Sequence, residues 1–450
     1  KIGCVNAPLN YRLSGGEIAL LIDQSKPKVL IYDAEFEKII SEALRNVHHR
    51  PEIIIMADLN NEMDAPEGIV TYRDFVKDGS PENPVRKDKP SIYDETTRFF
   101  TSGTTNLPKA VPVNDINEVL SAHDVIMHFP LSPKDVTMNL TPWFHRGGLH
   151  SGGPCPTLYI GGTMVILRDF TPRLALQYVS LYHITFLIGA PTVIDMLCRI
   201  QETNPRDISS LHGIVLMGSP LDKEPCKRYM KVLTPNIFNG YGTTETFWNV
   251  FLRPYDLPDK AGYAGGACTD DDVRVVRVDT TKHVSPDELV PMDKETVGEV
   301  VIFAPNKSTF AYYDNPKTTE EKFHNGWLYT GDLATWDEHA YITIIGRKDD
   351  MIVSAGENIY PVQVESILNE HPKVAESLVF GIPDPKRGSV IAALIRPSDP
   401  SLTEKEMKQF CMNHPMLAPY KRPRIFRFVK ELPHNATGKL LHKLPPDFKF

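Results

Sequence analysis

The sequence predicts an α/β protein with a large N-terminal domain of helix-flanked sheets, a small β subdomain and a smaller α+β C-terminal domain. Three patterns lead to this fold class. Strands alternate with helices over the first half of the chain, short strands crowd together at 271–302, and helices mix with strands again after residue 347. Alternation of strands with helices favours parallel sheets. With 450 residues, the chain is long enough for two or three domains.

The alternation is clear from the start of the chain. Apolar residues at helical spacing predict a helix at 14–23, a buried strand follows at 28–32, and a second helix and strand follow at 35–47 and 52–56. A polar, proline-rich loop at 77–94 interrupts the pattern. Beyond it we expect helices at 119–128, 174–182 and 193–200, and strands at 185–188 and 214–217. These elements predict the helix-flanked sheets.

The second half changes character. A short strand at 273–278 and its neighbours predict the β subdomain, and a strand at 341–345 ends at Gly346. We place the domain boundary there, so the expected domains are 1–346 and 347–450. The C-terminal domain is expected to contain helices at 361–369 and 403–412 and strands at 374–379, 390–395 and 425–428.

Composition excludes several classes of protein. The net charge of −8 and the pI near 6.0 do not suggest a nucleic-acid or anionic-membrane partner. No apolar stretch approaches the roughly 20 residues that span a bilayer. The six cysteines are scattered without a Cys-x-x-Cys pair, which indicates reduced thiols and a cytoplasmic protein.

One short segment suggests an anion site. After the strand-like Arg98-Phe99-Phe100 come Thr101-Ser102-Gly103-Thr104-Thr105-Asn106-Leu107-Pro108-Lys109. Hydroxyl groups and close backbone N–H groups can hold phosphate oxygens, and lysine adds a mobile positive charge. The order differs from that of a P-loop, and alone the segment could equally be a surface turn.

Four further segments place charged residues beside glycine, each expected in a loop. They are Asn239-Gly240-Tyr241-Gly242-Thr243-Thr244-Glu245, Tyr329-Thr330-Gly331-Asp332, Gly346-Arg347-Lys348-Asp349-Asp350 and Asn435-Ala436-Thr437-Gly438-Lys439. The Glu245 carboxylate suits a hard cation such as Mg²⁺.

With these segments in this order, the chain resembles the adenylate-forming superfamily of acyl- and aryl-CoA synthetases, luciferases and peptide-synthetase adenylation domains. The resemblance also includes Gly218-Ser219-Pro220 and Ser354-Ala355-Gly356-Glu357-Asn358-Ile359, and it extends over almost the whole chain. Members of this superfamily carry a further stretch before the point that matches Lys1, so we expect an N-terminal extension in the intact protein.

The resemblance implies roles for the residues of these segments. Thr101, Ser102, Gly103, Thr104, Thr105 and Lys109 would hold the β- and γ-phosphates of ATP, with Asn106 where the family usually has glycine. Tyr241, in the loop of Gly240, Gly242 and Thr243, would stack on adenine opposite Gly218, Ser219 and Pro220. Thr244 would contact the α-phosphate, Glu245 would bind Mg²⁺, and Asp332 with Arg347 would hold the ribose.

The resemblance also implies a mobile C-terminal domain. This domain would pivot about Asp349, bringing Lys439 to the α-phosphate in one orientation and Ser354, Ala355 and Gly356 to the pantetheine of coenzyme A in the other. The plain alternatives are a solvated surface lysine at 439 and a solvated loop charge at 349.

The acyl side of the site is expected around Trp143-Phe144-His145-Arg146. His145 would lie near the acyl carboxylate, and the alternative is a histidine that belongs to the core. Arg146 stands where the family usually has an apolar residue. It is either a structural or solvated arginine, or a residue that contacts a polar substrate. No aspartate stands where peptide-synthetase domains bind an amino group, which argues against an amino-acid substrate. Phe247 and Trp248 are expected to shorten the acyl pocket, favouring a medium-size, cyclic or aromatic acid.

The sequence therefore predicts an ATP-dependent carboxylate–CoA ligase that uses Mg²⁺, forms an acyl adenylate and releases pyrophosphate. Two alternatives stay open: an enzyme that loads a carrier-protein phosphopantetheine, and a catalytically silent nucleotide-binding homologue. A luciferase-like oxygenase is disfavoured because nothing in the chain suggests oxygen chemistry.

Overall fold

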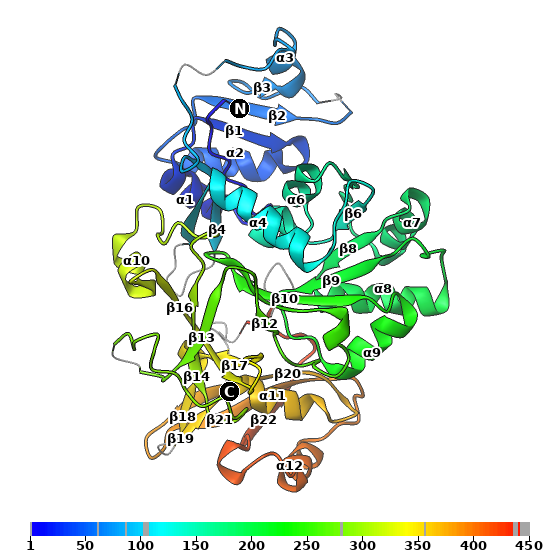
Figure 1. Cartoon of the computed structure of the whole chain (residues 1–450), viewed down its shortest axis with the longest axis vertical. Coiled ribbons are helices and arrows are strands. Elements are labelled where there is room, and N and C mark those ends of the chain that lie inside the picture. The colour runs from blue at the N-terminus through cyan, green and yellow to red at the C-terminus, as the bar shows by residue number, and fades with distance from the viewer. Residues whose placement is uncertain are drawn as a thin grey trace.

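The structure is a computed structural model, which describes residues 2–60, 63–85, 88–101, 108–279, 282–354, 357–434 and 440–441. Figure 1 shows the N-terminal elements at one end of the molecule, a large sheet with its helices in the middle and the C-terminal elements at the other end. Among the described residues, none of the helices combines the length and the apolar character needed to cross a membrane.

The N-terminal elements form a small parallel sheet, as the alternation predicted. Strands β1 (Val29–Asp33), β2 (Ile53–Ala57) and β3 (Val70–Thr71) pair in that order, with α1 (Gly15–Ser25), the 3-10 helix η1 (Ala34–Phe36), α2 (Glu37–Asn46) and α3 (Tyr72–Val76) between and around them. Ser14 caps α1 through a capping box with Glu17, which fixes where this helix begins.

A hairpin and three helices follow. Strands β4 (Glu95–Thr101) and β5 (Lys109–Asn114) pair antiparallel, and Asn114 caps α4 (Asp115–His128). Helices α5 (Arg146–His150) and α6 (Pro154–Tyr159) lie against α4.

The middle of the molecule is a seven-stranded sheet in the order β12-β11-β10-β9-β8-β6-β7. The strands are β6 (Val136–Asn139), β7 (Thr163–Met164), β8 (Phe186–Gly189), β9 (Gly213–Met217), β10 (Ile237–Thr243), β11 (Phe247–Leu252) and β12 (Gly266–Ala267). From β10 to β7 the strands are parallel, whereas β11 pairs antiparallel with both β10 and β12. Helices α7 (Pro172–Tyr182), α8 (Pro191–Thr203) and α9 (Lys223–Val232) bury their apolar faces against it. Fully buried Leu176, Ile194 and Ile214 belong to this core.

The β subdomain is antiparallel. It contains β13 (Asp272–Val276), β14 (Gly298–Phe303), β15 (Phe323–His324), β16 (Trp327–Trp336) and β17 (Ile342–Arg347), with the 3-10 helix η2 (Pro254–Asp256) before it and α10 (Pro316–Lys322) leading into β15. The subdomain extends well beyond residue 302 because the long strand β16 pairs with both β14 and β17.

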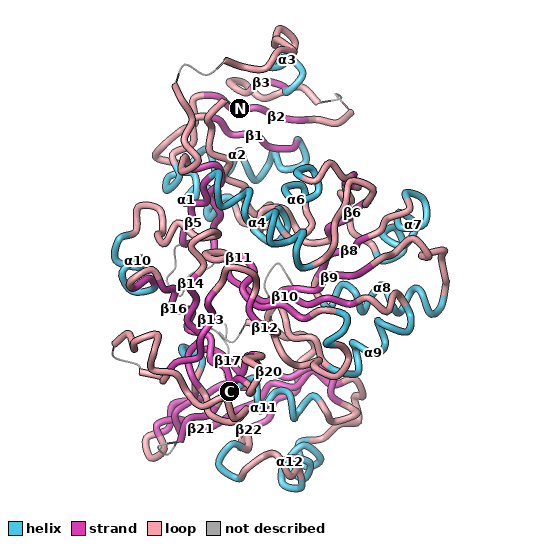
Figure 2. The backbone as a smooth tube through the Cα atoms, in the orientation of Figure 1, coloured by secondary structure: helices cyan, strands magenta, loops and turns pink. Residues whose placement is uncertain are grey.

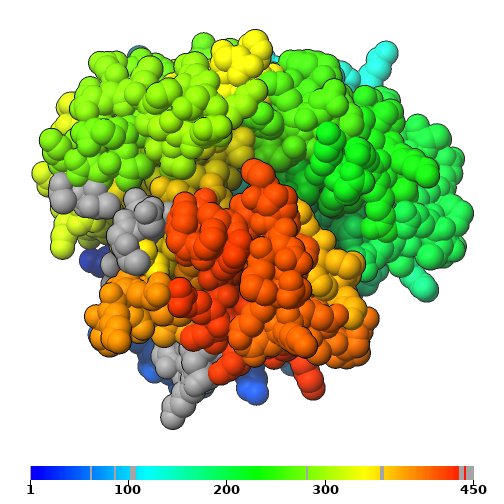
Figure 3. Space-filling view, turned by 90° about the horizontal axis from the view of Figure 1, so that it is seen from below, coloured from blue at the N-terminus to red at the C-terminus, as the bar shows by residue number. Residues whose placement is uncertain are grey.

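The C-terminal elements build a core of their own. The 3-10 helix η3 (Lys348–Asp350) leads to a hairpin of β18 (Ile352–Ser354) and β19 (Glu357–Ile359). After the hairpin come α11 (Pro361–Asn369), β20 (Val374–Asp384), β21 (Gly388–Pro397), α12 (Glu404–Asn413), η4 (Pro419–Lys421) and β22 (Ile425–Phe428). Ile342 packs in the β subdomain and Ile352 in the C-terminal core, so the packing partners change between these two residues. Figures 2 and 3 show these elements against the N-terminal part. The predicted fold, a large N-terminal domain and a smaller C-terminal one, is confirmed.

The prediction that the charged, glycine-containing segments lie in loops is wrong for three of them. Residues 239–243 lie in β10, 329–332 in β16, and Gly346 with Arg347 in β17. Glycine at position 242 allows the backbones of β10 and β11 to approach closely, because a Cβ there would lie 1.7 Å from the backbone oxygen of Phe247 on β11. The fifth segment, 435–439, lies outside the described residues.

Candidate active site

The predicted adenine-binding residues lie at the carboxyl ends of neighbouring parallel strands. Gly218, Ser219 and Pro220 follow β9, and Gly240 on β10 pairs with Met217, the last residue of β9. Gly218 has a φ of 88°, which favours glycine. Carboxyl ends of parallel strands, where the strand order reverses, are the usual place for a ligand in an open α/β sheet.

Tyr241, Asp332 and Arg347 form a connected group between β10 and the β subdomain. The Tyr241 hydroxyl donates to Asp332 Oδ2 at 2.6 Å, and Arg347 Nη1 donates to Asp332 Oδ1 at 2.8 Å. Burial and the Asp332 charge raise the pKa of Tyr241 well above its ordinary value. Burial opposes the Arg347 charge, but Asp332 raises the pKa of this guanidinium. Asp332 is therefore held in place from two sides.

Glu245, Tyr312 and Lys109 form a second group. The Tyr312 hydroxyl donates to Glu245 Oε1 at 2.6 Å, and the Lys109 ammonium lies 5.4 Å from the centre of the Tyr312 ring. Burial lowers the pKa of Lys109, and the neighbouring Lys322 ammonium lowers it further, while Glu245 and Asp349 raise it. Thr101 pairs with Lys109 across the β4–β5 hairpin, so the backbone of this lysine is fixed by the sheet.

The other predicted residues are placed less completely. Seven of them lie outside the described residues: Ser102, Gly103, Thr104, Thr105, Ala355, Gly356 and Lys439. Thr243 shares a hydrogen bond of 2.9 Å with Thr246 at the turn between β10 and β11. Ser354 ends β18, and its hydroxyl donates to the backbone oxygen of Ser389 at 2.7 Å.

His145 and Arg146 face different surroundings although they are adjacent. His145 Nε2 is buried and has no hydrogen-bond partner among the described residues. Burial, and then the charge of Arg12, lowers the pKa of His145 to about 4, so its ring is neutral near pH 7. A neutral ring with an unpartnered nitrogen can donate one hydrogen bond to a ligand oxygen.

Arg146 is a structural arginine, 2% exposed. Its Nη1 donates to the backbone oxygen of Thr244 at 2.8 Å, and its Nη2 donates to the backbone oxygen of Lys307 at 2.7 Å and to Ser121 Oγ at 3.2 Å. Burial lowers its pKa to about 10, which leaves it charged. Arg146 therefore fixes the backbone of Thr244, beside Glu245.

The prediction that Phe247 and Trp248 line an acyl pocket is not supported. Both side chains are 3% exposed, stack on each other at 5.1 Å, and belong to an aromatic core with Phe129 and Phe251. Their strand is buried on both faces, and the core to which they belong also contains Val125 of α4.

Tyr312 and Arg146 are the residues whose positions the sequence did not reveal. No local pattern marks a tyrosine that reaches Glu245 from 67 residues away. The only sequence signal for Arg146 was a charge at a position where the family usually has an apolar residue.

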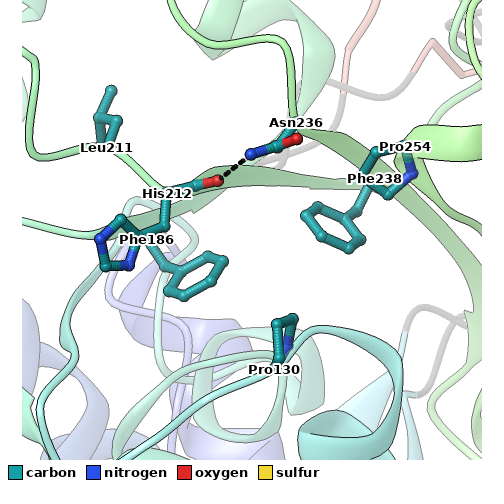
Figure 4. A pocket seen from close by; sticks show the side chains of 7 residues that line it. All are labelled: Pro130, Phe186, Leu211, His212, Asn236, Phe238 and Pro254. Atoms are coloured by element: carbon teal, nitrogen blue, oxygen red, sulfur yellow. Dashed lines mark hydrogen bonds between the residues drawn. The ribbon is translucent and has the colours of Figure 1, made fainter.

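Two cavities among the described residues lie apart from the Glu245 and Asp332 groups. The larger, of about 530 Å³, opens at the amino ends of β8, β9 and β10, the edge opposite Gly218; Figure 4 shows its lining residues, among them Phe186, His212 and Phe238. The smaller, of about 260 Å³, lies between η3, β18 and the strands of the C-terminal domain and includes Asp349. Neither contains the Glu245 or Asp332 group.

A buried ionic cluster lies beneath the β10–β11 turn. The Lys307 ammonium, 2% exposed, contacts Asp124 Oδ2 at 2.8 Å and Asp271 Oδ2 at 2.7 Å. Asp124, His128 and Cys268 are close enough together to suit a metal ion, but the Lys307 ammonium already supplies the positive charge beside them. This cluster is structural.

The chain belongs to the AMP-binding enzyme family. The profile of that family matches residues 1–313, and the profile of the AMP-binding enzyme C-terminal domain matches residues 363–439. The family that the sequence motifs predicted is confirmed.

Three relatives show the range of this similarity. The chain is 30% identical to a feruloyl-CoA synthase of Amycolatopsis sp. over 443 residues, covering 98% of this chain and 83% of the relative. It is 30% identical to 4-hydroxybutyrate–CoA ligase 2 of Metallosphaera sedula over 451 residues, covering 97% and 79%. The o-succinylbenzoate CoA synthetase of Bacillus subtilis, solved with its acyl-adenylate intermediate, superposes with a TM-score of 0.81 at 28% identity, covering 98% and 82%.

Proposed function

We propose that this protein is an AMP-forming carboxylate–CoA ligase, which activates an organic acid as an acyl adenylate and transfers the acyl group to coenzyme A. The observation that carries the proposal is the paired arrangement of Glu245 with Tyr312 and of Asp332 with Tyr241, beside Lys109. Two oriented carboxylates and a neighbouring cation suit a magnesium-bound nucleotide. The names of the relatives support the same reaction.

The chemistry takes two steps. In the first, an oxygen of the acid attacks the α-phosphorus of ATP, and the bond to pyrophosphate breaks with its electron pair leaving on pyrophosphate. In the second, the thiolate of coenzyme A attacks the acyl carbon, and AMP leaves with the electron pair of the broken acyl–oxygen bond. Catalysis of both steps depends mainly on positioning and on neutralising charge on the oxygens.

The chain supplies groups for each part of the nucleotide. Tyr241 would stack on adenine, Asp332 with Arg347 would hold the ribose, and Thr244 would contact the α-phosphate. Lys109 and the segment 101–105 would bind the β- and γ-phosphates, and Lys439 would neutralise charge at the α-phosphate in the first step. Because Asp332 and Glu245 are already hydrogen-bonded, little reorganisation is needed when the nucleotide binds.

Glu245 fits a magnesium site. Its Oε1 accepts from Tyr312, while its second oxygen has no hydrogen-bond partner among the described residues. Mg²⁺ is commonly held by one or two carboxylates together with phosphate oxygens, and it would neutralise charge on those oxygens. Tyr312 orients the carboxylate for that purpose.

The acid is proposed to be cyclic or aromatic and to meet His145. The unpartnered Nε2 of His145 can donate to the carboxylate that attacks phosphorus. The feruloyl and o-succinylbenzoate relatives support an aromatic acid, whereas the 4-hydroxybutyrate relative represents a short aliphatic one. A panel that includes both kinds distinguishes them.

The second step is proposed to use a different orientation of the C-terminal domain. The domains would be 1–346 and 347–450, with the hinge at Asp349 and with Ser354, Ala355 and Gly356 facing the pantetheine. The change of packing partners between Ile342 and Ile352 supports a hinge in this stretch.

We place the protein in the cytoplasm. All six cysteines have free thiols, and four of them are buried, as expected in a reducing compartment. Fractionation of cells that express the tagged chain tests this, and recovery in an organelle, as for the peroxisomal butyrate–CoA ligase of Arabidopsis thaliana, would contradict it.

The test of function is pyrophosphate release over a panel of aromatic, cyclic and short aliphatic acids, with and without coenzyme A. Mass spectrometry should detect an acyl adenylate without coenzyme A and an acyl-CoA with it. Formation of the adenylate without any acyl-CoA would favour a carrier-protein phosphopantetheine as acceptor. Binding of ATP without pyrophosphate release from any acid would instead indicate a silent homologue.

A further inference from the structure

Lys322 lies at the edge of the proposed nucleotide site, although none of the sequence motifs includes it. It is the last residue of α10 and is half-buried. A Cβ at Gly331 would lie 3.4 Å from the Lys322 ammonium and 3.3 Å from Arg347 Nη2. The ammonium therefore reaches the glycine that precedes Asp332, on the same stretch of β16 that Arg347 contacts.

The charge of Lys322 also acts on Lys109. Burial has the largest effect on the pKa of Lys109 and lowers it, and the charge of Lys322 lowers it further. Among the described residues, no carboxylate lies within ion-pair distance of either ammonium, whereas Arg347 is paired with Asp332. The carboxylates of Glu245, Glu321 and Asp349 only partly offset this repulsion at Lys109, and an anion placed beside both ammonium groups would reduce it further.

The helix that carries Lys322 is anchored to the rest of the site. Asn315 caps α10, and the backbone N–H of Tyr312 donates to Thr319 Oγ1 at 2.9 Å. Phe323, directly after Lys322, is 9% exposed and packs in the core of the β subdomain. Because Tyr312 also holds Glu245, the position of the Lys322 backbone is tied to that of the proposed magnesium ligand.

We propose that Lys322 is a second lysine that binds the polyphosphate of ATP and the departing pyrophosphate, together with Lys109. The proposal rests on the proposed function, because it takes the nucleotide to lie between Asp332 and Lys109. The Lys322 ammonium contacts β- or γ-phosphate oxygens and stabilises negative charge on pyrophosphate as the α–β bond breaks. AMP carries neither of these phosphates, so its binding does not depend on Lys322.

The test compares Lys322→Gln with the wild type in pyrophosphate–ATP exchange, using an acid that the wild type accepts. A charged hydrogen bond to phosphate is lost, so the KM for MgATP and the KM for pyrophosphate should each rise about tenfold. The affinity for AMP, measured by calorimetry, should stay unchanged. Lys322→Arg, which keeps the charge, should recover most of the loss. The matched control is Lys317→Gln, which removes an exposed lysine from the same helix and should leave all three constants unchanged.

Two results would overturn the inference. One is an unchanged KM for pyrophosphate in Lys322→Gln. The other is an equal loss of AMP and MgATP affinity, which would indicate general damage to the site. If the wild type catalyses no exchange with any acid, the proposed function fails, and direct titration of both proteins with MgATP and with AMP still decides whether Lys322 recognises the polyphosphate.

Discussion

Removing one hydroxyl group, in Tyr312→Phe, tests whether Glu245 must be oriented for the first half-reaction. The hydroxyl donates to Glu245 Oε1 at 2.6 Å, and the tyrosine is 5% exposed. Phenylalanine keeps the ring that packs on Phe323 and lies beneath Lys109, so the main change is the loss of this one hydrogen bond.

The size of the effect follows from the charge on the acceptor. A hydrogen bond to a charged group contributes about 1.5–3 kcal/mol, and about 1.4 kcal/mol corresponds to a tenfold change in rate. If the bond serves to hold Glu245 where the transition state needs it, adenylate formation should slow about 10- to 100-fold. The Mg²⁺ concentration for half-maximal rate should rise as well, because a Glu245 carboxylate that Tyr312 no longer orients binds the ion less well.

The assay is single-turnover formation of acyl-AMP over a range of Mg²⁺ concentrations, with thioester formation from preformed acyl-AMP measured in parallel. Thioester formation should stay near the wild-type rate. Tyr341→Phe is the matched control, since it removes a tyrosine–carboxylate bond of 2.8 Å to Asp256 away from the site. Unchanged adenylation and Mg²⁺ dependence in Tyr312→Phe would refute the role given to Tyr312.

The remaining predictions concern the hinge, the C-terminal lysine and the acyl side. Lys439→Ala should abolish adenylate formation yet leave thioester formation from preformed acyl-AMP near the wild-type rate; equal loss of both rates would contradict its role. Asp349→Pro should slow thioester formation far more than adenylation in single-turnover experiments, and equal slowing would argue against a hinge there. His145 has a pKa of about 4 in the folded protein against an ordinary value near 6.5, so the unfolded chain binds more protons between these values. Its contribution to stability is complete above pH 6.5 and is lost as the pH falls toward 4, which corresponds to about 2 kcal/mol at pH 5. Urea unfolding at pH 7.5 and pH 5 should show that His145→Gln loses less stability on acidification than the wild type, and parallel losses would exclude His145 as the cause.

The regular elements could be predicted from the sequence because their periodicity is local. The helix expected at 361–369 is α11, and the strand expected at 425–428 is β22, with the same bounds. Residues 329–332 were predicted to form a loop because they contain glycine, but they lie within β16. A glycine with φ of 75° at Gly331 is compatible with a strand that passes close to Arg347 and Lys322, and the sequence alone does not report such neighbours.

The site was predictable only as far as its motifs extend. Tyr241, Glu245, Asp332 and Lys109 were found from their segments. In the structure Tyr241 is hydrogen-bonded to Asp332 and Glu245 to Tyr312, and the Lys109 ammonium lies over the Tyr312 ring. Tyr312 could not be found in this way, because its contact with Glu245 depends on how the β subdomain packs against β10. The burial of Phe247 and Trp248 was missed for a similar reason: aromatic residues next to a site motif are as easily core as pocket lining.

The buried Lys307 has a consequence for how the N-terminal domain holds together. Its ammonium is neutralised by Asp124, which lies 183 residues earlier in the chain, and by Asp271. A fragment that contained only one of these partners would have to bury an uncompensated charge or leave that interior open to water. The stretches around Asp124 and Lys307 should therefore unfold together, and a protein divided between them should regain its native form only when both pieces are present.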